Sequence, residues 1–322
     1  MIHLKPRLFV AITGLLAGAS TVVVPQMPSR GRVSGVAYTI RVTSTPHAGS
    51  GGSGAMTAAA QNYVGNALFA ANRGRMDVVD GAVESLFAKG DYILFDSTDL
   101  VIVHPASKTF VPLPHDVAGQ TMDRLTSIGV KMTIGDEKVA LDSLGFGDTV
   151  AGIATNHYRM TTGFTMSVDA GVVQQRLTTE SITDYWVASV PGLPRNPLLR
   201  ANGLSGPSTM TGMFKSISAK VDSAAKRMGS AVALKTTTVS RLMDGQGTNT
   251  TMQQTSNVSN IQPRDIDDTL LVLPSDYVPR ALTGVEQPVA DDAGAKWRIP
   301  PRPRPVRTER RRSLSSSVRP KQ

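Results

Sequence analysis

Side chains able to do acid–base or metal chemistry are few in this sequence. The 322 residues contain five histidines and no cysteine. His104 and His115 flank one predicted strand, and His157 stands far along the chain beside Tyr158 and Arg159. A hydrolytic metal site usually needs about three closely placed His or carboxylate ligands, and no H-x-x-x-H or comparable spacing is present. The sequence therefore predicts no metal site, and it excludes thiolate ligands and disulfides.

Neither a nucleophilic serine nor a calcium loop is indicated. No serine lies in a G-x-S-x-G elbow, and Gly203-Leu204-Ser205-Gly206 lacks both that spacing and a preceding apolar strand. The acidic runs 265–268 and 291–292 lack the spacing and closing glutamate of an EF-hand, so we interpret them as solvated loop carboxylates. We expect a non-enzymatic protein without a cofactor. An enzyme ranks third among the functional hypotheses, after two non-enzymatic ones. It requires His104, His157 or acidic loop residues gathered around a cleft.

The N-terminus has the order of a secretion signal. Basic Lys5 and Arg7 precede the apolar stretch 8–16, and Ala17-Gly18-Ala19 offers small side chains to a peptidase. We predict cleavage after Ala19 and export, to the periplasm. The alternative is a retained membrane anchor, because the apolar character resumes before Pro25 and the combined length approaches the roughly 17–20 residues of a spanning helix.

The positive charge of the chain is concentrated at its C-terminus. Residues 296–322 hold ten Lys or Arg and one acid, so they account for the whole net charge of +9, and the rest of the chain is formally neutral. The run Pro-Pro-Arg-Pro-Arg-Pro from Pro300 lacks backbone donors, which predicts disorder. Such a tail would bind an anionic membrane surface, with nucleic acid disfavoured by export, or it would have no dedicated partner. The arginines predicted to make the contact are Arg302, Arg304, Arg310, Arg311 and Arg312.

Extended segments dominate the region between signal and tail. They are rich in β-branched residues and are separated by short polar turns, a pattern typical of an antiparallel meander. The predicted segments are 33–45, 61–79, 92–95, 100–103, 109–111, 130–134, 138–144, 148–154, 157–162, 164–168, 181–188 and a hairpin over 232–254, which 270–273 could continue. We divide the chain into a signal peptide at 1–19, a linker at 20–32, a β-rich domain at 33–285 and a disordered basic tail at 286–322.

Two helices are predicted within this β-rich domain. A short one covers 117–128, and the stronger one covers 208–233, where Pro207-Ser208 supplies a stop and an N-cap. The stronger helix has an apolar stripe that would pack on a sheet. The stripe consists of Met210, Met213, Phe214, Ile217, Val221, Ala224, Met228 and Val232.

A series of strand-and-turn motifs carries a resemblance over roughly residues 33–280. The motifs are Gly74-Arg75-Met76-Asp77, Tyr92-Ile93-Leu94-Phe95 leading to 103–110, Asp148-Thr149-Val150-Ala151-Gly152 followed by Asn156-His157-Tyr158-Arg159, Asp184-Tyr185-Trp186-Val187, and Leu273-Pro274-Ser275-Asp276-Tyr277. In this order they resemble a family of exported bacterial proteins of unknown function that share the fold of the lipoprotein carriers LolA and LolB. The basic tail lies outside that pattern, and the missing cysteine differs from LolB, which is itself a lipoprotein.

This resemblance implies a β-dominated α+β fold, and it carries over no catalytic residue. The fold would be a curved antiparallel sheet, an unclosed half-barrel, with amphipathic helices across its concave face and an apolar hollow that takes acyl chains in the carriers. If the helix fills that face incompletely, the cleft would favour an apolar guest. The expected lining residues are Met122, Met213, Phe214, Ile217 and Met228.

The leading hypothesis is therefore an exported envelope protein that binds or carries a lipid, or the acyl chain of an acylated protein. The alternative is a structural or interaction protein whose own side chains fill the core and whose basic tail tethers it to anionic surfaces.

Overall fold

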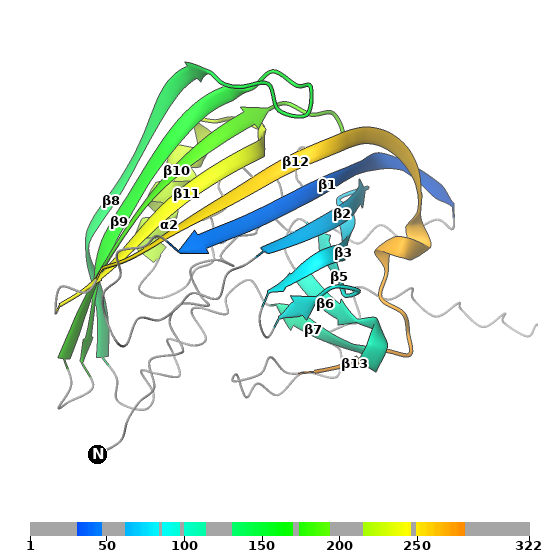
Figure 1. Cartoon of the computed structure of the whole chain (residues 1–322), viewed down its shortest axis with the longest axis horizontal. Coiled ribbons are helices and arrows are strands. Elements are labelled where there is room, and N and C mark those ends of the chain that lie inside the picture. The colour runs from blue at the N-terminus through cyan, green and yellow to red at the C-terminus, as the bar shows by residue number, and fades with distance from the viewer. Residues whose placement is uncertain are drawn as a thin grey trace, which may run out of the picture.

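A computed structural model describes residues 31–46, 62–83, 86–96, 100–113, 131–169, 174–193, 215–245 and 249–280. In these ranges one large, curved, unclosed sheet dominates and a single α-helix accompanies it (Figure 1). The predicted α+β class with a half-barrel sheet is confirmed.

The first half of the chain forms an antiparallel meander. Its runs of β-branched and aromatic residues fold as neighbouring strands, and the short β4 pairs with β3 beside the main path. The elements are β1 (Arg32–Pro46), β2 (Asn62–Ala70), β3 (Arg73–Val83), β4 (Phe87–Ala88), β5 (Tyr92–Asp96), β6 (Leu100–His104), the 3-10 helix η2 (Pro105–Ser107) and β7 (Thr109–Leu113).

The second half adds a further meander with longer strands. Its elements are β8 (Lys131–Phe146), β9 (Asn156–Asp169), β10 (Gln174–Ala188), the helix α2 (Lys215–Lys226), β11 (Val232–Asp244), β12 (Asn249–Asp267), the 3-10 helix η5 (Asp268–Leu271) and β13 (Val278–Pro279). The last strand, β13, is parallel to β7 at one edge of the sheet, and β8 is the opposite edge.

The two meanders join where β1 pairs with β12. This antiparallel ladder runs from Arg32 opposite Asp267 to Pro46 opposite Met252, with an irregularity near Asn260, which has a φ of 55°. The first strand in the chain and its last long strand are therefore neighbours in the middle of the sheet order. Their pairing joins the two meanders into one continuous sheet.

Strand boundaries differ from the sequence prediction in several places. Residues 61–79, predicted as one extended segment, belong to the two strands β2 and β3, which are joined at Ala71 and Asn72, both with positive φ. Segments 130–134 and 138–144 form the single strand β8, which continues through a bulge at Asp136 (φ 53°). Segments 157–162 and 164–168 likewise form the single strand β9. Residues 148–154, predicted as a strand, form a tight turn closed by one bridge between Val150 and Ile153.

The last strands of the sheet also differ from the sequence prediction. Strand β12 continues beyond the predicted end at 254, because β1 pairs with it as far as Asp267, while β11 pairs with it only up to Asn257. Residues 268–271 then form η5 instead of a further strand. Asp267 caps η5 by accepting the backbone N–H of Thr269 at 2.9 Å. Asp265 and Asp267 therefore belong to a strand end, not to the predicted loop.

The described helix α2 ends earlier than predicted. Three backbone hydrogen bonds tighten the last turn, and Gly229 adopts a φ of 70°, a left-handed conformation that stops a helix. Met228 therefore lies in the turn after the helix, and Val232 begins β11. The predicted helical residues 208–214 lie outside the described residues.

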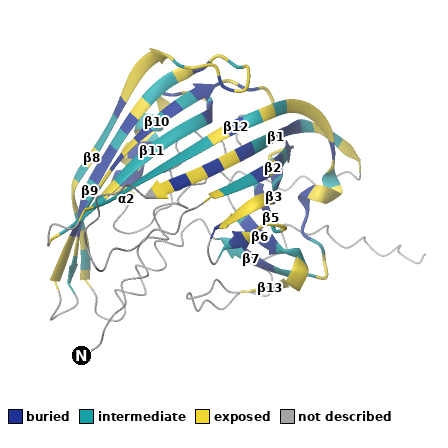
Figure 2. Ribbon diagram, in the orientation of Figure 1, coloured by how far each residue is buried: buried dark blue, intermediate teal, exposed yellow. Residues whose placement is uncertain are grey.

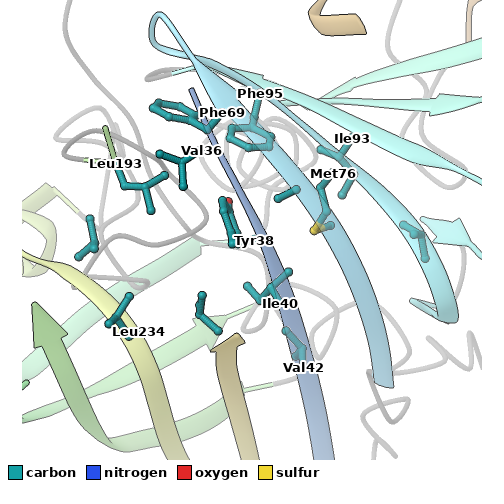
Figure 3. Close-up of a cluster of buried hydrophobic side chains, with 14 of the residues drawn as sticks. Val36, Tyr38, Ile40, Val42, Phe69, Met76, Ile93, Phe95, Leu193 and Leu234 are labelled. Carbon is teal, nitrogen blue, oxygen red and sulfur yellow. The ribbon is translucent and has the colours of Figure 1, made fainter. Parts of the chain in front are cut away.

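Two apolar clusters occupy the concave side of the sheet. The larger one is built mainly on the first meander, as Figure 3 shows for Tyr38, Met76 and Leu234 among others. The smaller one places α2 against β8 to β11. Full burial of each such side chain contributes about 1.5–3 kcal/mol, so these clusters supply much of the folding free energy.

The segment after η5 covers the convex side of β5 to β7. There Leu273 is buried against Tyr92, Leu94 and Phe110, and Tyr277 packs beside them. Because both faces are covered, the centre of β5 is buried without alternation, whereas burial alternates along the second half of β10 (Figure 2).

Several predicted features lie outside the described residues. They are the signal peptide, the helix at 117–128 and the basic tail. Within the described ranges, no helix has the length and apolar character needed to cross a membrane.

Candidate functional site

The concave face between β9 and β1 is the candidate site. Strand register sets which residues lie on it, because side chains alternate between the two faces and paired residues share a face. One row across the sheet consists of Tyr158, Tyr185, Thr236, Ser256 and Val42. Tyr185 contacts the apolar cluster with α2, which lies on the inner side of the sheet in Figure 1.

The two predicted lining residues within the described region both lie at this face. Ile217 and Met228 are buried at 7% and 5% exposure, in the cluster that also contains Met160 and Tyr185. The structure thus brings the helix stripe onto the sheet. The other three, Met122, Met213 and Phe214, lie outside the described residues, as do the five predicted tail arginines.

Beside this apolar cluster the concave face carries two cross-strand hydroxyl pairs. The hydroxyls of Ser181 and Ser240 are 2.8 Å apart, and those of Thr183 and Thr238 are 3.1 Å apart. Ser181 and Thr183 are buried, and Ser240 and Thr238 are partly buried. Sequence reasoning missed these pairs, because Ser and Thr are unremarkable in strands until register places them opposite one another.

The Tyr185 hydroxyl continues this hydroxyl series along β10. It is buried, and no group of the described residues meets hydrogen-bond geometry with it. Burial raises the pKa of Tyr185 far above its usual range, and nearby Thr183 opposes that effect. A buried phenol without a partner is costly, so its O–H is a donor available for an acceptor.

The same concave rows contain no formal charge. On β9, β10, β11 and β12, the concave residues of the regular stretches 158–166, 177–185, 236–242 and 250–258 are apolar, hydroxyl or amide side chains. These rows can therefore contact apolar chains and uncharged hydrogen-bond acceptors, and they hold no counter-ion for a bound charge; the ion pair of Lys220 and Glu137 lies at the edge, between α2 and β8.

The convex face of the same strands carries the ionisable groups. Asp184 accepts hydrogen bonds from His157 at 2.9 Å and from both Nε and Nη2 of Arg159 at 3.0 Å. Burial tends to raise the pKa of Asp184, but the hydrogen bonds from Arg159 and His157 outweigh it and lower the pKa. Trp186 stacks on His157, with ring centroids 4.6 Å apart, and the Lys235 ammonium lies 4.1 Å from the Trp186 ring centroid.

The histidines that the enzyme hypothesis needs do not meet. His104 on β6 bonds Asp91 through Nδ1 at 2.9 Å, whereas His157 on β9 bonds Asp184. Seven strands separate β6 from β9 in the sheet order. Among the residues that the structure describes, no group of three or more His and carboxylate side chains could hold a metal ion.

Comparison with known proteins adds no family assignment. No protein-family model matches the chain, and no curated protein matches its sequence.

Proposed function

We propose that this protein is a non-enzymatic, exported envelope protein that binds or carries an apolar ligand, a lipid or the acyl chain of a lipoprotein, on the concave face of its sheet. The motif series that resembles the LolA-like family supports this proposal, as does the signal-like N-terminus. The ligand would lie against α2 and the concave faces of β8 to β12.

One observation carries the proposal: a curved sheet that does not close has two apolar clusters on its concave face, where the rows of β9 to β12 carry no charge. A β-sheet needs only one covered face, and here the charges of β9 and β10 are placed on the other one. Buried Met76, Met160, Met166 and Met228 belong to the core, and flexible Met side chains adapt to irregular apolar guests.

Native mass spectrometry of protein purified from an envelope fraction, followed by lipid extraction, tests this function. We expect a mass increment that extraction removes, and binding of an uncharged fluorescent acyl probe to the emptied protein. The variant Met160→Asp should abolish probe binding, because it places a charge on the concave face. Ser167, exposed on the convex face of the same strand, provides a matched control as Ser167→Asp, which should leave probe binding unchanged. An empty protein that also fails to bind the probe would refute the proposal.

A second candidate function is favoured by the deep burial of the concave clusters. Tyr38, Met76 and Leu234 are at most 2% exposed, as expected for a core filled by its own side chains. In that case the basic tail would tether a structural or interaction protein to an anionic surface. Deleting 296–322 should then abolish salt-sensitive binding to anionic vesicles, and unchanged binding would exclude the tether.

A further inference from the structure

The hydroxyl pairs of the concave face have unused hydrogen-bond donors. Each hydroxyl carries one O–H, and a pair of hydroxyls uses one of the two in its mutual bond. Ser181 and Ser240 make no other side-chain hydrogen bond within the described part of the chain, whereas the Thr183 hydroxyl also lies near the Tyr185 phenol and lowers its pKa. The Ser181/Ser240 pair therefore retains one O–H that is donated to no described residue, and Thr238, Thr183 and Tyr185 have three O–H groups for at most two mutual bonds, which leaves one more.

These donors are adjacent. Positions 181, 183 and 185 alternate along β10 on one face, so the two pairs and the Tyr185 hydroxyl form three successive donor positions, about 7 Å from each to the next along the strand. Tyr185 is 1% exposed, its hydroxyl has no described partner, and its ring contacts the apolar cluster with α2. A donor row therefore borders an apolar surface.

The chemistry of this border selects among apolar ligands. Donors without a partner favour a ligand with an acceptor oxygen over a pure hydrocarbon. A fatty-acid anion would lose its hydration over the rows of β9 to β12, which carry no cation, and that loss is costly. A neutral carbonyl attached to an acyl chain satisfies both conditions.

We propose that the ligand is a neutral acyl ester or amide whose carbonyl oxygen accepts hydrogen bonds from the row formed by Ser181/Ser240, Thr183/Thr238 and Tyr185. This inference rests on the proposed function and assigns the ligand class and the specificity-determining residues. The acyl chain lies toward α2, and the carbonyl lies over β10 and β11.

Competition binding tests the inference with three probes of equal chain length. Monomyristoylglycerol, its ether analogue tetradecylglycerol and the myristate anion compete against uncharged N-phenylnaphthylamine on the emptied full-length protein. Since a neutral hydrogen bond contributes about 0.5–1.5 kcal/mol, the ester should bind about five-fold tighter than the ether. Myristate should bind more weakly than the ester at neutral pH.

Variants that remove whole hydroxyl pairs isolate the donors. Ser181→Ala with Ser240→Ala, and Thr183→Val with Thr238→Val, leave no orphaned partner and should reduce the ester-to-ether preference to about one-fold, with the ether affinity unchanged. The control replaces Thr165 and Thr178 by Val, a hydroxyl pair 3.4 Å apart on the convex face of β9 and β10, and should keep the preference.

The outcomes separate this inference from the proposed function. Equal binding of ester and ether to the native protein, or a preference that survives in the pair variants, overturns the inference and leaves the function standing. Failure of all probes, including N-phenylnaphthylamine, overturns both. Should a pair variant not fold, Tyr185→Phe keeps the ring and should lower the ester preference about two-fold; an unchanged preference counts against the donor row.

Discussion

The two faces of β9 to β11 differ in chemistry although they are made by the same strands. Tyr185 faces a hydroxyl-rich, uncharged interior, whereas its neighbours Asp184 and Trp186 hold His157, Arg159 and Lys235 on the outside. A period of two residues is enough to produce this separation. The comparison shows that these strands combine an uncharged, hydroxyl-rich inner face with an ion-paired outer face.

The largest difference in stability is expected when either of two neighbouring aromatic residues on opposite faces is replaced by alanine. Tyr185→Ala should lower the free energy of unfolding by about 3–5 kcal/mol, because it empties a fully buried site. Trp186→Ala, on the partly buried convex face, should lower it by about 1–2 kcal/mol. Urea unfolding measures both values, and equal losses would contradict the assignment of faces.

Breaking the convex ion cluster should have a smaller effect. Asp184→Asn should destabilise the fold by about 1–2 kcal/mol at neutral pH, because it weakens charged hydrogen bonds to a partly buried carboxylate. The exposed pair Asp136–Arg176 is the control, and Asp136→Asn should have no measurable effect.

This ion cluster also predicts a pH dependence. The pKa of Asp184 is lowered in the folded state, so its stabilisation is complete above the unfolded value, about 3.9, and is lost as pH falls through the lower folded value. The stability difference between native protein and Asp184→Asn should therefore shrink below about pH 4. A constant difference down to pH 2 would argue against a lowered pKa.

Glycines on the two faces should respond differently to a methyl group. A Cβ on Gly74 would lie 2.2 Å from the ring of Phe95, which stacks on Phe69, so Gly74→Ala should cost about 1–3 kcal/mol. A Cβ on Gly163, on the convex side of β9, would meet nothing closer than 3.5 Å. Thermal unfolding of Gly163→Ala should show an unchanged or slightly raised Tm.

The attachment of α2 to the sheet edge should give the smallest effect. Glu137 accepts hydrogen bonds from Lys220 at 2.7 Å and from Ser216 at 2.6 Å, and these contacts lower its pKa. Lys220 is half exposed, so Glu137→Gln should cost less than about 1 kcal/mol. The local readout is faster hydrogen exchange over 215–226, and unchanged exchange there would show that apolar packing alone holds the helix.

The strands could be predicted from the sequence where they consist of β-branched and aromatic residues. They could not be predicted where polar residues are extended only because a neighbouring strand pairs with them. β1, β5, β6 and β7 have runs of β-branched and aromatic residues that any sheet would bury. The second half of β12 is rich in Ser, Asn, Gln and Asp, and it is a strand because β1 pairs with it as far as Asp267, whereas β11 pairs only with the first half. Glycine and acidic residues at 135–137 suggested a break, but a bulge accommodates them within β8.

The candidate site was predictable only in part. Ile217 and Met228 follow from helical periodicity, and both lie on the sheet. The hydroxyl pairs could not be found, because Ser181 and Ser240 are far apart in sequence and only register makes them neighbours. The same holds for Asp184 and its partners His157 and Arg159, which lie on a neighbouring strand.

The sequence by itself determined a β-rich neutral body, the apolar stripe of α2, the absence of cysteine chemistry and the basic character of the last 27 residues, because composition and periodicity are local properties. Only the tertiary structure decided that β1 and β12 join two meanders into one curved sheet, and that hydroxyls and charges are placed on opposite faces. Those features depend on long-range register, and a one-residue slip would exchange the two faces.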